Sequence, residues 1–182
     1  MQTVDSNLVQ DIRVIKFENS VGVIFPAGFT EKLIGPKDSG NITSFTPDTN
    51  LIRRVNNEID YQYYQISENA ILSLFTPSLK ASKPDSVRRS LSKDAIKTIN
   101  MVSVEVFLYW QENGTYYDRQ FVGLVMPNGE KVININLIDF RQDPHNLKRY
   151  FLNTWISGWH GWFYSNVRQL TFNVNKNRLS AD

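Results

Sequence analysis

The chain contains no cysteine among its 182 residues. Disulfide scaffolds, thiolate zinc sites, iron–sulfur clusters and cysteine nucleophiles are therefore excluded. Histidine is almost as rare, with only His145 and His160, so no metal site built on imidazole ligands is predicted. Apolar runs such as Val21 to Phe25 are only a few residues long, far below the ~20 residues that a membrane-spanning helix needs, and no membrane partner is expected.

Motifs that carry catalytic chemistry are also missing. The sequence has no G-x-S-x-G, no P-loop, no G-x-G-x-x-G and no H-E-x-x-H. His145 lies near Asp139 and Asp143, a minimal acid–base pair, but it is expected to be exposed in the first turn of a helix. We therefore predict no catalytic residue, no cofactor and no metal, and a protein that is not an enzyme.

Strong charge of one sign is absent as well. Lys and Arg total 20 and Asp and Glu total 18, so the net charge is +2, which does not favour a dedicated nucleic-acid-binding protein. The first residues are neither basic nor apolar, so no signal peptide is visible, and we expect synthesis in the cytoplasm of a cell or of a host cell.

Composition divides one predicted domain, 1–182, into segments. The half 1–78 is loop-rich, and 79–97 is an exposed basic connection with six basic and two acidic residues. Residues 98–174 hold the most legible patterns, and 175–182 are expected to form a loose tail.

The strongest pattern predicts a three-stranded antiparallel meander over residues 102–140. Residues 102, 104, 106, 108 and 110 are all apolar, an alternation typical of a half-buried strand, and Asn113-Gly114 is a hairpin signal that pairs Trp110 with Tyr117. At Pro127-Asn128-Gly129 a three-residue loop suits proline better than a two-residue loop. That register places Ile133 opposite Gly123 and Ile135 opposite Phe121.

A helix at about 144–157 is predicted next, because Asp143 is a good N-cap, Pro144 suits the first helical position and an apolar stripe follows. Leu170, Phe172 and Val174 then alternate, which predicts a strand at 167–174. The fold class is therefore α+β: an antiparallel sheet, with extra strands from the N-terminal half, that forms a sandwich or partly open barrel with one main helix.

The N-terminal half gives weaker signals. The spacing of Leu8, Ile12 and Ile15 predicts a short helix, and Val21 to Phe25 reads as a strand. Phe29 to Asn50 is expected to be mostly loop. Ile59 to Ile66 is either a strand or the end of a helix from Leu51, and its many tyrosines favour the strand.

Aromatic residues are concentrated near the predicted helix. Between Tyr150 and Tyr164, seven of fifteen residues are aromatic. These rings either fill the core between helix and sheet, as most tryptophans do, or form an exposed contact platform. The interface candidates are Trp155, Trp159, Trp162, Phe163, Tyr164, Tyr116 and Tyr117.

The basic connection supplies a second candidate. Its lysines and arginines either form a solvated loop, which we favour, or contact phosphates or an acidic partner. The candidates are Lys83, Arg88, Arg89 and Lys93.

Two functional hypotheses follow. The favoured one is a non-enzymatic structural or assembly subunit, such as a virion component of a phage tail, neck or baseplate, whose partners are copies of itself and neighbouring structural proteins. The alternative is a small β-barrel module that binds single-stranded nucleic acid or carbohydrate through Tyr109, Trp110, Tyr116 and Tyr117.

Overall fold

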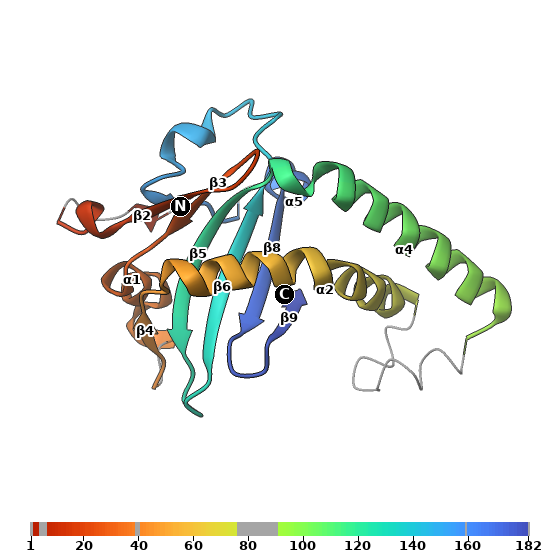
Figure 1. Cartoon of the computed structure of the whole chain (residues 1–182), viewed down its shortest axis with the longest axis horizontal. Helices are drawn as coiled ribbons and strands as arrows, with labels where there is room; N and C mark the ends of the chain where they lie inside the picture. Colours follow the sequence, from red (N-terminus) through yellow and green to blue (C-terminus); the bar gives the residue numbers. More distant parts are fainter. Residues whose placement is uncertain (1, 4–6, 39–40, 76–90, 159, 182) are drawn as a thin grey trace.

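An open seven-stranded sheet forms the centre of the protein in the computed structural model, which describes residues 2–3, 7–38, 41–75, 91–158 and 160–181 (Figure 1). The strand order is β2-β3-β5-β6-β8-β9, and β4 also pairs with β5. β3 runs parallel to β5 and the other pairs are antiparallel, so the sheet is mixed. The strands are β2 Arg13–Lys16, β3 Val21–Ile24, β4 Thr43–Phe45, β5 Asp118–Val125, β6 Lys131–Ile138, β8 Val167–Asn173 and β9 Arg178–Ala181.

Helices and a second, two-stranded sheet complete the described part of the chain. In the small sheet, β1 Gln2–Thr3 pairs with β7 Thr154–Trp155. The α-helices are α1 Ala27–Asp38, α2 Thr49–Phe75, α4 Lys93–Asn113 and α5 His160–Asn166, and the 3-10 turns are η1 Val9–Asp11, η3 Gly114–Tyr116 and η4 Leu147–Tyr150. The predicted combination of a sheet with packed helices is confirmed, but a single main helix is wrong. The predicted purely antiparallel sheet is also wrong, because β3 pairs with β5 in parallel, and the sheet is open and not closed into a barrel.

The β5–β6 hairpin has the predicted register. Phe121 pairs with Ile135 and Gly123 with Ile133. Gly129 has a φ of 80°, the left-handed conformation that the three-residue loop requires. Hydrophobic pattern and turn chemistry therefore select the same pairing. The strands predicted from Val21 to Phe25 and over 167–174 are also present, as β3 and β8.

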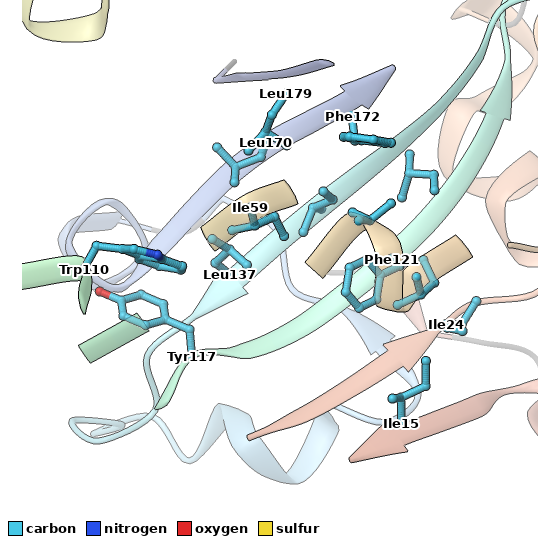
Figure 2. Packing of buried hydrophobic residues seen from close by; sticks show 14 residues of the cluster. Ile15, Ile24, Ile59, Trp110, Tyr117, Phe121, Leu137, Leu170, Phe172 and Leu179 are labelled. Atoms are coloured by element: carbon cyan, nitrogen blue, oxygen red, sulfur yellow. The ribbon is translucent and has the colours of Figure 1, made fainter. Parts of the chain in front are cut away.

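One face of the sheet is covered by α2. Ile52, Val55 and Ile59 of α2 follow helical spacing and are fully buried. All three belong to the same core cluster as the apolar side chains of the strands, and Figure 2 shows Ile59 among them, with Trp110 and Tyr117 at one end of the cluster. The strand side chains in this cluster are Ile15, Ile24, Phe121, Ile133, Ile135, Leu137, Leu170, Phe172 and Leu179.

The opposite face of the sheet holds buried amides as well as apolar groups. Gln120 and Asn136 are cross-strand neighbours with no exposed surface. The Gln120 amide donates to the carbonyls of Phe151 (2.8 Å) and Thr154 (2.6 Å), and its oxygen accepts from the Ile156 N–H (2.9 Å). The Asn136 amide donates to the Ile156 carbonyl at 2.7 Å. These bonds hold residues 151–156 flat on the sheet.

This arrangement explains why the helix predicted at 144–157 is wrong. Asp143 does cap a turn, since its carboxylate accepts from the N–H groups of Leu147 and Lys148, but only the short η4 follows. Two backbone groups that a longer helix would use internally, the Phe151 carbonyl and the Ile156 N–H, are instead bonded to Gln120. Tertiary hydrogen bonds therefore override the local helical pattern.

The strand predicted from Val102 to Trp110 is wrong, because this segment lies within α4. Ser92 caps the helix, and its side chain accepts from the Ala95 N–H at 3.2 Å. Asn113-Gly114 is not a hairpin turn. Gly114 has an ordinary negative φ, and a Cβ there would lie 2.6 Å from the Trp110 ring, so glycine lets that indole pack closely.

The N-terminal half is also more helical than predicted. Residues 29–50 contain most of α1 as well as β4, and Ile59 to Ile66 belongs to α2, so the helical alternative for that segment is correct. The helix predicted around Leu8 to Ile15 is a single 3-10 turn followed by β2. Burial of one side of α2 against the sheet therefore outweighs the β propensity of the tyrosines.

The C-terminal tail is not loose, because its residues Arg178–Ala181 form β9. The turn before β9 places Asn177 in the left-handed region, with a φ of 49°. Glu58 and Gln62 of α2 hold this hairpin: Glu58 accepts from the Asn177 amide, and Gln62 accepts from the Leu179 N–H, each at 2.8 Å. Of the predicted basic connection 79–97, residues 79–90 lie outside the described residues, and Lys93 and Lys97 belong to α4.

Candidate interaction surfaces

The helix α4 packs on α2 by one side only. Figure 1 shows both helices extending past the edge of the sheet formed by β8 and β9, where they contact each other. On the side of α4 that faces the rest of the protein, Ile99 and Trp110 are buried. Trp110 stacks on Tyr63 of α2 with ring centroids 4.0 Å apart and lies 5.6 Å from the Tyr117 ring. These contacts fix the C-terminal end of α4 to the sheet.

The other side of α4 exposes apolar side chains. Met101, Val104 and Leu108 are 57%, 47% and 50% exposed. Their spacing of i, i+3 and i+7 places them in one stripe, and Lys97 continues it toward the N-terminus. We call these four residues the outer face of α4. Apolar side chains that cluster in this way on an exposed helix are typical of contact surfaces.

Polar and charged groups are buried where α4 meets the sheet. Arg119 is buried and donates to the Ser20 hydroxyl and to the carbonyls of Tyr117 (2.8 Å) and Gly114 (3.2 Å). Its guanidinium also lies 4.7 Å from the centre of the Phe17 ring, while its Nε has no hydrogen-bond partner. Burial lowers the pKa of Arg119, and the nearby carboxylates of Asp60 and Asp118 oppose that shift. These contacts make Arg119 a structural group.

The tyrosines around this junction are similarly perturbed. Burial raises the pKa of Tyr63 and also the pKa of Tyr117, whose hydroxyl is hydrogen-bonded to Tyr109. Partial desolvation likewise raises the pKa of Asp60, although the residue is exposed overall, and the Arg119 charge and a hydrogen bond with Trp110 oppose that shift. Each shift arises from packing at the base of α4, so none of them points to catalysis by itself.

A second surface lies beside this junction. We call Tyr109, Tyr116 and Arg141 the Tyr–Arg cluster. Both tyrosines are about half exposed, and the Arg141 guanidinium lies 5.6 Å from the centre of the Tyr116 ring and 3.5 Å from the Tyr109 hydroxyl. Tyrosine and arginine are enriched among the residues that dominate binding at protein interfaces.

Near the Tyr–Arg cluster, the basic side chains are exposed to solvent and the carboxylates that they pair with are nearly buried. Arg141 pairs with Asp139 at 2.6 Å and Lys148 with Asp118 at 3.1 Å; both cationic side chains are well exposed, and both carboxylates are nearly buried. Hydrogen bonds from Arg141 lower the pKa of Asp139. A partner approaching this surface therefore meets positive charge first.

The predicted interface residues are placed very differently by the structure. Trp155, Phe163 and Tyr117 are buried, Trp162 is half buried and donates to the Gln142 carbonyl, and Tyr116 is exposed. Trp159 lies outside the described residues, and for Tyr164 only the helical backbone of α5 is described. The rings of Trp155 and Phe163 belong to the apolar cluster on the face of the sheet opposite α2. Only Tyr116 thus lies within a surface described above.

The predicted cationic residues fall mostly outside the described part of the chain. Lys83, Arg88 and Arg89 lie in the segment 76–90, whereas Lys93 is exposed in the first turn of α4. The sequence prediction missed Met101, Val104 and Leu108 as surface residues. Helical spacing was the available signal, but Val104 and Leu108 also fit the alternation of a strand, which is the structure that the sequence analysis predicts.

The neighbours of His145 give no support for an acid–base pair. His145 is exposed, Asp139 is bonded to Arg141, and Asp143 caps η4. Within the described ranges, no group of three or more histidine, aspartate or glutamate side chains is placed to hold a metal ion. Among the described helices, none has the length and apolar character required to cross a membrane.

Comparison with known proteins found no family model, no curated protein and no solved structure that matches this chain. The argument on function therefore rests on the two surfaces described above.

Proposed function

We propose that the protein is a non-enzymatic assembly subunit that acts through protein–protein contacts. The observation that carries this proposal is the outer face of α4, where Met101, Val104 and Leu108 are about half exposed on one stripe of a 21-residue helix. Water contact at three neighbouring apolar side chains is unfavourable, and covering them by a partner removes that cost. The Tyr–Arg cluster adds a second surface with the residue types that dominate interfaces.

The concrete form that we propose is a structural component of a virion or of a phage tail, neck or baseplate. This part of the proposal rests on the sequence alone, namely its 18 asparagines, the absence of catalytic motifs and the many aromatic residues. Electron microscopy of concentrated protein tests it, because such a component is expected to form rings, tubes or other regular assemblies.

Light scattering after size exclusion, over a wide range of loading concentrations, tests the assembly proposal itself. The mean molar mass is expected to rise above 21.1 kDa as concentration increases. Leu108→Ser should reduce that rise, because it places a hydroxyl in the apolar stripe. Leu152→Ser is the matched control, since Leu152 has the same 50% exposure as Leu108 but lies elsewhere on the surface. A mass that stays monomeric at every concentration for all three proteins would contradict the proposal.

The Tyr–Arg cluster favours a second candidate function, binding of single-stranded nucleic acid. Tyr109 and Tyr116 offer faces for base stacking, while Arg141 and Lys148 present exposed positive charge. The burial of Trp110 and Tyr117 removes half of the platform predicted from the sequence.

Fluorescence anisotropy of a labelled oligonucleotide tests this second candidate. Binding at low salt that weakens at high salt, and that Arg141→Ala reduces, is the expected result. If the anisotropy does not change at low salt, the candidate is rejected.

A further inference from the structure

The outer face of α4 lies directly opposite the side that packs on α2. Nine residues of an α-helix make about two and a half turns, so Leu108 points away from the direction in which Ile99 is buried. Met101 and Val104 lie close to the same line. The exposed stripe is therefore a separate surface, and not the margin of the contact with α2.

The charged residues of α4 are distributed unevenly along the helix. Lys93 and Lys97 outnumber Asp94 in the N-terminal half, and the C-terminal half carries Glu105 and Glu112 and no cation. The arrangement is nearly symmetric about a point between Val104 and Glu105. Lys97 lies as far before that point as Glu112 lies after it, and Met101 and Leu108 are related in the same way.

This pattern is complementary to itself when a second helix runs in the opposite direction. Each Lys97 then faces the partner's Glu112, and each Met101 faces the partner's Leu108. A parallel pair would place Lys97 against the partner's Lys97 and Glu112 against the partner's Glu112. Like charges in contact oppose binding, so charge selects the antiparallel arrangement.

We propose that the outer face of α4 binds the same face of a second copy of this chain, with the two helices antiparallel and a two-fold axis near Val104. The inference rests on the proposed assembly function and names the partner of its main surface. Such an isologous contact uses one patch twice, as in most homodimers. Because each copy contributes three half-exposed apolar side chains, the contact is small, and its dissociation constant is expected to be micromolar or weaker.

Charge reversal measured by sedimentation velocity tests the direction of the helices. Lys97→Glu and Glu112→Lys should each weaken the dimer by about tenfold, because each replaces two attractive pairs by two repulsive ones. The double variant Lys97→Glu/Glu112→Lys restores both pairs and should regain most of the affinity. Lys16→Glu, the same charge change at an exposed position of β2, is the control and should have little effect. Failure of the double variant to recover would overturn the antiparallel pairing.

Cross-linking gives an independent test, since the chain has no cysteine and each introduced thiol is unique. A mixture of Lys97→Cys and Glu112→Cys proteins should be joined by a short bifunctional maleimide, and Val104→Cys should be joined to itself. Lys97→Cys alone should not be joined, because 15 residues of helix separate the two thiols by about 22 Å along the axis.

The outcomes of cross-linking separate this inference from the function on which it rests. Self-joining of Lys97→Cys would indicate parallel helices and overturn the inference. A dimer in solution that none of these cysteines captures would place the contact elsewhere, which also overturns the inference but leaves the assembly function standing. A strictly monomeric protein, unchanged by Leu108→Ser, would overturn both.

Discussion

The central strands and the helix α4 both carry apolar side chains on two sides, but they differ in how those sides are covered. In β6, Ile135 and Leu137 are buried under α2, while Asn136 and Ile138 on the other side are buried under the chain that crosses the opposite face. In α4, Ile99 and Trp110 are buried, whereas Met101, Val104 and Leu108 remain exposed. An element with apolar side chains on two sides is fully shielded from water only when both sides pack against other groups. The described part of the chain packs against only one side of α4. We propose that a second copy supplies the other.

The largest expected effect comes from the doubly covered region. Phe121→Ala should lower the free energy of unfolding by about 4 kcal/mol, because the ring is fully buried between the sheet and α2 and its removal leaves a cavity. Urea denaturation followed by circular dichroism measures the change. A loss below about 1 kcal/mol would show that the sheet is not the main source of stability.

Removal of a buried amide should have the next largest effect. Gln120→Ala leaves the carbonyls of Phe151 and Thr154 and the N–H of Ile156 without their partner, and should cost about 3 kcal/mol. The matched control is Asn134→Ala, which removes one hydrogen bond to a half-buried Thr171 and should cost about 1 kcal/mol. The Ile156 amide should also exchange with solvent faster in Gln120→Ala. Equal losses in the two variants would contradict the role assigned to Gln120.

Acid should weaken the covered region through Asp139. Hydrogen bonds from Arg141 hold the pKa of Asp139 below its ordinary value of 3.8, so this carboxylate stabilises the folded state above about pH 4. That contribution is lost as the pH falls through the lower, folded-state pKa. The melting temperature should therefore drop less steeply below pH 4 in Asp139→Asn than in the natural protein, and Arg141→Gln should flatten the profile in the same way. Profiles that coincide for all three proteins would rule out this linkage.

The smallest effect is expected on the outer face of α4. Leu108→Ser should change the free energy of unfolding of the dilute protein by less than about 0.5 kcal/mol, because half of the side chain already contacts water. Ile99→Ser on the opposite side should be strongly destabilising, since Ile99 is buried. Urea titrations of the two variants measure the contrast. Similar losses would mean that both sides of α4 support the fold.

The same comparison explains which parts of the fold the sequence predicts. For β5 and β6, Phe121, Ile133 and Ile135 agree with the turn at Gly129, so local and tertiary signals coincide and the register is correct. For α4, the buried positions Ile99 and Trp110 fit a helix. The exposed Val104 and Leu108 complete an alternation that fits a strand equally well. That alternation also includes Trp110, which is buried, so residues on both sides of α4 contributed to the wrong strand prediction.

Other errors have a tertiary origin. The pattern from Asp143 to Trp155 suits a helix locally, and nothing near it in sequence reveals that Gln120 and Asn136 bind its backbone. The aromatic residues around Trp155 were predicted to be either core or interface, and the structure places Trp155 and Phe163 in the core. Arg141 carried no sequence signal, because its neighbours Tyr109 and Tyr116 come from elements whose placement only the structure defines.

Oxidation of methionine measures the central claim most directly. Met101 lies on the outer face of α4 and is 57% exposed, whereas Met126 is half buried beside the β5–β6 turn and serves as an internal reference. Brief exposure to hydroxyl radicals, followed by mass spectrometry of the methionine sulfoxides, reports the solvent access of each side chain. We expect the yield at Met101 to fall as protein concentration rises, while the yield at Met126 stays constant. A Met101 yield that does not change from dilute to concentrated protein would contradict the account.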